Sequence, residues 1–192
     1  MKYILFLLFV LALGACHVKP DKKVSYYYDT DSLLQQQKNI LQQRHASILK
    51  TATIQGNKEK STIKPDGSVS WDQEFQIFEK ININKPVLRG VYDVKEYDDI
   101  RSNLKVKEYH TSEKDAEVLF LKIYYLNKPA NLRKIEAKYV ENNPIYRSQR
   151  HLEFLFDDHT GAPLLHQYTV RGSQKMIFKD SVLFTVTGKI DL

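Results

Sequence analysis

The chain has a single cysteine, Cys16, and no hydrophobic segment of membrane-spanning length. One cysteine excludes an internal disulfide, and 192 residues suffice for one domain that folds without a disulfide or a metal. The apolar run from Tyr3 to Leu13 is too short for a transmembrane helix, which needs roughly 20 residues. A helical membrane anchor is therefore not expected.

Motifs that carry chemistry are also missing. The sequence contains no GxSxG nucleophile turn, no glycine-rich phosphate loop and no HExxH metal motif. Its six histidines follow no metal-ligand spacing. The sequence therefore predicts no metal site and names no catalytic residue. An enzyme whose active site is assembled from residues distant in the sequence stays a second alternative.

The first sixteen residues have the organisation of an export signal. Lys2 precedes the apolar run, and the small residues Gly14 and Ala15 stand directly before Cys16. This pattern is typical of a secretory signal peptide that is cleaved between Ala15 and Cys16. The predicted organisation is a signal peptide over 1–15, a tether over 16–30 and one domain over 31–192.

The four residues Leu13, Gly14, Ala15 and Cys16 resemble the lipobox of bacterial lipoproteins, with glycine at a place where it is less usual. The resemblance implies that the Cys16 sulfur receives a diacylglycerol and that its amino group is acylated, for example with palmitate. It implies a membrane as the partner. No cofactor is expected besides this covalent lipid. An aspartate after the acylated cysteine tends to mark inner-membrane retention, whereas this chain has His17. The resemblance therefore implies an outer-membrane lipoprotein whose domain faces the periplasm.

Positive charge is in excess but not concentrated. Lysines and arginines number 29 against 23 acidic residues, and they are spread along the chain. Export excludes nucleic acid as a partner, so the charge indicates a solvated surface. A weak attraction to anionic lipid headgroups is the remaining interpretation.

Two helices are expected in the N-terminal half. Asp31 and Ser32 are good N-cap residues, and an apolar stripe with heptad spacing predicts a helix from there to about Lys50, with His45 packed on the same side. The preceding Tyr26, Tyr27 and Tyr28 are expected to dock on the domain, the alternative being the membrane interface. Whether residues 50–56 form a short strand or a frayed helix end is left open.

The segment from Ser70 to Ile81 is predicted as the second helix. Its apolar residues fit both a helix and a strand, but Ser70 lies three residues before Gln73, as in an N-terminal cap. The lone tryptophan, Trp71, is expected to anchor this helix on a sheet. The alternative is that Trp71 stacks on a ligand.

From residue 87 onward the pattern changes to the alternation of strands. Strands are expected near 87–96, 103–110, 116–126, 131–141, 147–156, 162–171, 174–179 and 182–190, with tight turns at Gly172-Ser173 and Asp180-Ser181. Since no helix-length segment intervenes, the sheet is predicted to be antiparallel. His166 and Tyr168 are placed on its apolar face, together with Met176 and Phe178.

The predicted fold class is α+β, with two N-terminal helices packed on a curved, mostly antiparallel sheet of about seven to eight strands. The favoured function is a non-catalytic, membrane-anchored envelope lipoprotein that binds or scaffolds an envelope protein. The alternative is a carrier of a lipid or other apolar ligand, because the architecture loosely resembles that of periplasmic lipoprotein carriers. Its ligand contacts would be Trp71, His166 and Tyr168, in a cavity between sheet and helices; a face filled by Trp71, Phe75 and Phe78 would count against it.

Overall fold

The computed structural model describes residues 25–65, 70–159 and 161–192. The predicted signal peptide, its cleavage site at Ala15 and Cys16, and the tether up to residue 24 lie outside this part. Most of the predicted domain lies within it.

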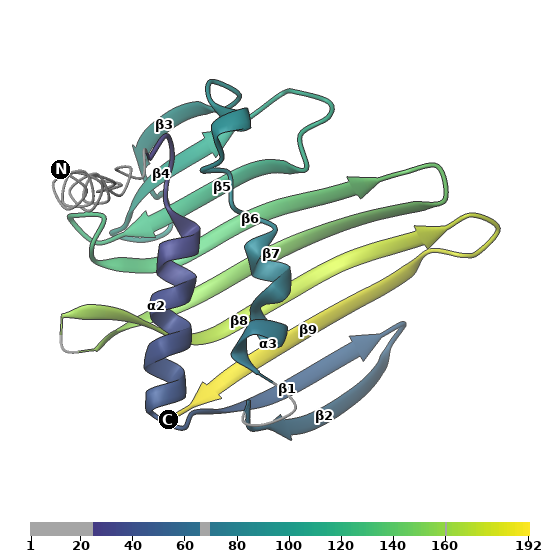
Figure 1. The fold of residues 1–192 in the computed structure, drawn as a ribbon, viewed down its shortest axis with the longest axis horizontal. Helices are drawn as coiled ribbons and strands as arrows, with labels where there is room; N and C mark the ends of the chain where they lie inside the picture. Colours follow the sequence, from purple (N-terminus) through teal and green to yellow (C-terminus); the bar gives the residue numbers. More distant parts are fainter. Residues whose placement is uncertain (1–24, 66–69, 160) are drawn as a thin grey trace, which may run out of the picture.

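An antiparallel sheet of nine strands forms one layer of the domain (Figure 1). The strands are β1 (Ser47–Ile54), β2 (Asn57–Ile63), β3 (Asp93–Asp98), β4 (Lys105–His110), β5 (Val118–Tyr125), β6 (Leu132–Asn142), β7 (Tyr146–His159), β8 (Ala162–Met176) and β9 (Val182–Asp191). Their order across the sheet is β2-β1-β9-β8-β7-β6-β5-β4-β3. From β3 to β9 each strand pairs with the next one along the chain, while β1 returns to pair with β9.

The second layer consists of the helices α2 (Thr30–Gln43) and α3 (Trp71–Glu79), which cross one face of the sheet (Figure 1). A short 3-10 helix, η2 (Pro86–Leu88), follows α3. The predicted α+β class, with both helices near the N-terminus and an antiparallel sheet, is confirmed.

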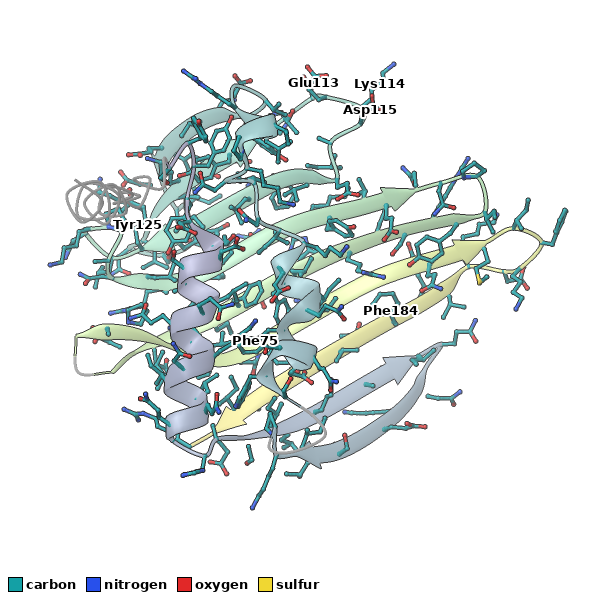
Figure 2. The ribbon with its side chains drawn as sticks, in the orientation of Figure 1. Phe75, Glu113, Lys114, Asp115, Tyr125 and Phe184 are labelled. Carbon is teal, nitrogen blue, oxygen red and sulfur yellow. The ribbon has the colours of Figure 1, made fainter. Side chains whose placement is uncertain are left out.

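The helix α3 begins where its sequence predicts. The Ser70 hydroxyl caps it by accepting a hydrogen bond from the Gln73 amide at 3.4 Å. Phe75 and Phe78 are buried in the core, and Figure 2 labels Phe75 beside α3. The cap signal thus correctly separated a helix from a strand.

The ends of α2 differ from the prediction. Asp29, not Asp31 or Ser32, caps the helix, because its carboxylate accepts the Ser32 amide hydrogen at 3.0 Å. The helix ends at Gln43 because His45 adopts a left-handed conformation (φ 51°), and the Ala46 amide then bonds back to the Leu41 carbonyl at 3.0 Å. His45 is therefore exposed at the point where the chain reverses, and it does not pack on the helix. Residues 47–54 form β1, so the segment 50–56 is a strand that ends in a turn and not a frayed helix end.

The strands differ from the prediction in three places. Residues 86–88 form η2, so the predicted strand over 87–96 begins only at Asp93. The predicted strands 162–171 and 174–179 are one strand, β8, because Gly172 lies mid-strand against the Phe184 ring and does not form a turn. The edge strand β2 was not predicted, because its polar, exposed sequence has no apolar alternation.

Aromatic rings fill the space between α3 and the sheet. The Phe78 ring lies edge-on to Phe154 of β7, with centroids 4.3 Å apart, and edge-on to Tyr168 of β8, at 5.0 Å. Phe75 and Trp71 continue this cluster along the helix. Contacts of this kind bury large apolar areas and fix the helix on the sheet.

Tyr27 attaches the start of the described chain to the sheet near β4 and β3, at the edge opposite β2. Its ring lies edge-on to Tyr92 and Tyr109, with centroids 5.4 and 5.7 Å away. Its hydroxyl donates to the Leu88 carbonyl at 3.0 Å and accepts from the Tyr92 amide at 3.2 Å. The tyrosine triplet therefore docks on the domain, as expected.

Lys38 connects the two helices. Its buried Nζ lies 2.9 Å from Asp72 Oδ1 and 2.8 Å from Glu79 Oε1, both on α3. Burial by itself lowers the pKa of Lys38, but hydrogen bonds to Asp72 and Glu79 outweigh it and hold this pKa above its usual value. Lys38 is therefore charged, and it clamps α2 to α3.

We expect the two sides of this clamp to respond unequally to substitution. Lys38→Met should cost about 1–2 kcal/mol, because it keeps most of the side-chain volume and leaves two carboxylates that water can reach. The pair Asp72→Asn and Glu79→Gln should cost about 3 kcal/mol, because it strands a buried ammonium. Urea unfolding at pH 7 measures the free energy of unfolding of both variants. Equal losses of this free energy would contradict the proposed role of Lys38 as a clamp.

Candidate functional site

Two of the predicted ligand contacts, Trp71 and Tyr168, lie in the packed core. Trp71 is 5% and Tyr168 is 2% exposed. The Tyr168 hydroxyl donates to Glu74 of α3, and Glu74 also lies 2.9 Å from the Lys50 ammonium. Burial raises the pKa of the Tyr168 phenol far above its usual value, and the hydrogen bond to Glu74 adds to this shift. In this structure Tyr168 holds α3 on β8, and a ligand role for it stays a prediction.

His166 does not join Trp71 and Tyr168, so its predicted place on the apolar face is wrong. The pairing of β7 with β8 shifts between Leu155 and Phe156, which leaves His166 as an extra residue in a bulge. Its side chain is 41% exposed, and its Nδ1 lies 3.2 Å from Asp157 Oδ2. The bulge breaks the alternation on which the prediction depended.

Gln37 of α2 supports the backbone of β8 at this bulge. Its amide nitrogen donates to the Pro163 carbonyl at 3.0 Å, and its oxygen accepts from the Leu165 amide at 2.8 Å. The side chain is fully buried. Gln37 therefore satisfies two backbone groups that the irregular strand leaves open.

Exposed apolar side chains gather instead at the end of the sheet where β6 meets β7, β8 meets β9 and β1 meets β2 (Figure 1). Half of the large apolar side chains that are exposed in the described chain lie there, and we call them the apolar end: Ile54, Ile145, Met176, Ile177, Phe178 and Leu183. The Ile177 amide donates to the Ile145 carbonyl at 2.9 Å, which joins the two main loops. Such a concentration marks an interaction surface.

Phe178 stands out within the apolar end. It is 98% exposed, and its φ of 60° places a bulky residue in the left-handed region. That conformation costs about 1 kcal/mol for a residue other than glycine. An exposed phenyl ring held at this cost is typical of a functional position.

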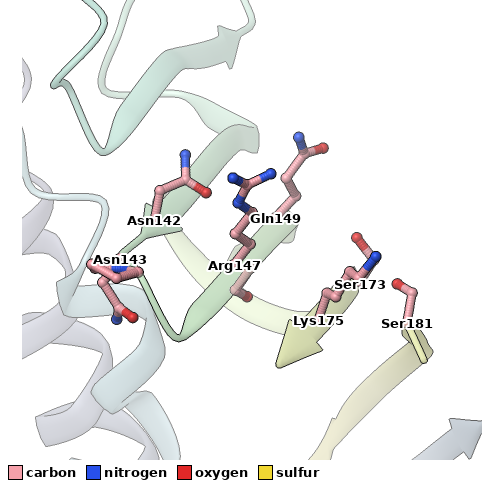
Figure 3. A pocket seen from close by; sticks show the side chains of 9 residues that line it. Asn142, Asn143, Arg147, Gln149, Ser173, Lys175 and Ser181 are labelled. Atoms are coloured by element: carbon pink, nitrogen blue, oxygen red, sulfur yellow. The ribbon is translucent and has the colours of Figure 1, made fainter. Parts of the chain in front are cut away.

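A polar pocket of about 780 Å3 adjoins the apolar end, and we call it the cation pocket (Figure 3). Its lining is Asn142, Asn143, Pro144, Arg147, Ser148, Gln149, Ser173, Lys175 and Ser181. Arg147 and Gln149 of β7 alternate with residues that face the helices, as do Ser173 and Lys175 of β8, so these four side chains lie on the opposite face of the sheet. The pocket is therefore open to solvent and separate from the core.

Arg147 and Lys175 are directly opposed across β7 and β8. Like charges at paired positions destabilise a sheet. Among the described residues neither has an ion-pair partner. An anion between them would relieve the repulsion and would be met by the surrounding amides and hydroxyls. The arrangement therefore suits a phosphate or carboxylate group.

A second hollow, of about 460 Å3, lies beside the start of α2, and much of its wall is apolar. Its lining is Tyr28, Asp29, Ser32, Leu33, Gln36, Pro129, Ala130, Leu132, Gly161, Ala162 and Pro163. A pocket of this size can hold a small apolar ligand.

The part of the chain that the structure describes contains neither a metal-binding cluster nor a membrane-spanning helix. Across 25–65, 70–159 and 161–192, no group of three or more His, Cys, Asp or Glu side chains is placed to hold a metal ion. No helix in those same ranges is long and apolar enough to cross a membrane.

Comparisons with known proteins add little to the α+β class that the fold defines. No family model matches the chain, and no curated protein matches it. Among solved structures, a LolA superfamily protein from Nitrosomonas europaea matches with 10% identity and a TM-score of 0.28, over 86% of this chain and 94% of that one. A likeness this weak carries no argument about function.

The sequence alone predicts neither the cation pocket nor the apolar end. In the sequence Arg147 and Lys175 count as scattered surface charge, and Met176 and Phe178 are predicted on the apolar face of the sheet; both are exposed instead. The available signal was the segment Lys175-Met176-Ile177-Phe178-Lys179, in which three apolar residues stand between two cations. Such a segment in a turn indicates an amphipathic, exposed loop.

Proposed function

We propose that this protein is a non-catalytic, lipid-anchored binding protein of the cell envelope that engages its partner through the apolar end and the cation pocket. The observation that carries the proposal is the pair Arg147 and Lys175, opposed without an ion-pair partner in the described chain and next to the exposed Phe178. The export signal and Cys16 support the location. The filled interface between α3 and the sheet supports a site on the outside of the domain.

The anchor is tested by Cys16→Ala. Because the thiol is the proposed acylation site, this variant should incorporate no alkyne-labelled palmitate and should keep its signal peptide. Lys19→Ala, close by but outside the motif, should label like the wild type. Gel fluorescence after coupling to a dye measures the labelling. Labelling of Cys16→Ala at the wild-type level would refute the anchor.

The proposed outer-membrane location has its own matched variant. His17→Asp places an aspartate directly after Cys16 and should move the labelled protein to the inner membrane on a density gradient. Equal distribution of both proteins would mean that residue 17 does not sort this chain.

A carrier of an apolar ligand is the second candidate, because the hollow beside α2 has a suitable size and lining. The aromatic cluster of Phe75, Phe78, Phe154 and Tyr168 fills the interface at α3, so the ligand would contact Leu33 and Leu132 instead. The Leu33→Gln protein should then bind a fluorescent fatty acid more weakly than the wild type. Failure of the wild-type chain to bind the fatty acid would remove this candidate.

A further inference from the structure

We infer that the apolar end is a docking surface for a bilayer that contains anionic phospholipid. Arg147 and Lys175 hold lipid phosphates, while Phe178 and Ile177 enter the acyl region beneath them. This inference rests on the proposed function, since it names the partner of the same surface.

The docking inference depends on cationic and apolar side chains that lie next to each other. A small hollow of about 240 Å3 is lined by Ile145, Met176, Ile177 and Phe178, and it shares Arg147 and Lys175 with the cation pocket. Cationic and apolar groups therefore meet at one rim. A phospholipid has the same arrangement, with a phosphate directly above hydrocarbon, and basic residues beside apolar ones bind such interfaces.

The positive charge beside the apolar end favours anionic over neutral phospholipid. Arg147 and Lys175 lie at the ends of β7 and β8 and Lys179 lies in the loop after β8, while Asp180 is the one acidic residue within 142–150 and 173–182. No ion pair among the described residues involves the three cations. Basic residues that are free of partners are attracted to the negative surface of a membrane.

The shape of the surface favours a bilayer over a folded partner. Phe178 projects with 98% of its surface exposed, from the loop after β8 and at the rim of the small hollow. A projecting ring needs a matching hollow on a protein, whereas a fluid membrane accommodates it anywhere. The docking contact is also separate from the proposed anchor, because Tyr27 holds the start of the described chain near β4 at the other edge of the sheet.

Depth-dependent fluorescence quenching tests the contact in the full chain. The Phe178→Trp protein is reconstituted into vesicles of phosphatidylethanolamine and phosphatidylglycerol that contain brominated phospholipid. Its added emission should shift to the blue and fall at least twofold, whereas Ile100→Trp, placed where the native side chain is 95% exposed on the turn between β3 and β4, should stay unquenched. The native Trp71 is buried and contributes equally to both proteins.

The headgroup contact is tested by adding Arg147→Gln and Lys175→Gln to the Phe178→Trp chain. Both native side chains are exposed and repel each other, so the thermal unfolding midpoint should not fall and should rise slightly, while the quenching should fall by more than half. Replacing phosphatidylglycerol with phosphatidylcholine should have the same effect.

Three results would overturn the docking inference: no quenching of the Phe178→Trp protein, equal quenching of the Ile100→Trp control, or quenching that ignores lipid charge. A protein partner for the apolar end would give the first of these. The docking inference and the proposed lipid anchor can be refuted independently, because palmitate labelling of Cys16 does not depend on where the side chain at position 178 lies.

Discussion

Gly188→Ala should cost about 3 kcal/mol of unfolding free energy, although it adds a single methyl group. Gly188 of β9 pairs directly with Tyr168 of β8, and the Tyr168 ring lies over it where a Cβ atom would stand. Overpacking of this kind costs about 1–3 kcal/mol when neighbours can shift. Here the ring can shift little, because its hydroxyl binds Glu74 and the ring packs on Phe78 in a T-shaped contact. We therefore expect the upper end of that range in urea unfolding.

A second background separates steric overlap from other effects of the substitution. In a Tyr168→Leu chain the aromatic ring is gone, so adding Gly188→Ala should cost less than about 1 kcal/mol. The difference between the two backgrounds measures the overlap itself. If Gly188→Ala costs the same in both, the ring is not what requires glycine at this position.

The tertiary role of Gly188 was not visible in the sequence, and Gly172 was misinterpreted for the same reason. A glycine in an alternating segment indicates either a turn or a close approach of another group. Gly172 was assigned to a turn, but it pairs with Arg150 of β7 and Phe184 of β9, so the strand continues through it. A Cβ there would lie 2.5 Å from the Gln149 carbonyl oxygen and 2.8 Å from the Phe184 ring. Figure 2 shows Phe184 on β9. Only the pairing of β8 with β9 decides between the two interpretations.

Local signals predicted local structure well where a side chain bonds to its own backbone neighbourhood. Ser70 identified the start of α3 because its hydroxyl caps the helix three residues ahead. The end of α2 had no such signal, since His45 takes a conformation that glycine or asparagine usually takes. The edge strand β2 is held by pairing with β1 and not by burial, so its sequence shows no periodicity.

The candidate site could not be predicted because strand pairing creates it. Arg147 and Lys175 are far apart in the chain, and only the register of β7 with β8 opposes them. The His166 bulge is set by the same pairing together with Gln37, which is more than a hundred residues away. The sequence did predict the class of fold, because that depends on short-range patterns, whereas Cys16 lies outside the described residues and its acylation stays a prediction.

Alkaline conditions should unfold this domain between pH 10 and 12. Burial raises the pKa of Tyr28, Tyr92, Tyr109 and Tyr139 to about 12 each. In the unfolded chain a tyrosine loses its proton near pH 10. Between these values the unfolded state binds fewer protons than the native state, so stability is complete below pH 10 and falls as pH rises.

The expected loss is large, because each such tyrosine contributes up to about 1.4 kcal/mol per pH unit. Summed over the four tyrosines and the two pH units, the upper limit of the loss is about 9 kcal/mol by pH 12, which is comparable to the whole stability of many domains. Urea midpoints at pH 8 to 12, with tyrosinate absorbance at 295 nm recorded in parallel, measure both the loss and its cause. Tyr139→Phe keeps a buried ring without a titrating group and should be as stable as the wild type at pH 8 but lose less above pH 10. Identical alkaline slopes for the two proteins would show that ionisation of Tyr139 is not linked to unfolding.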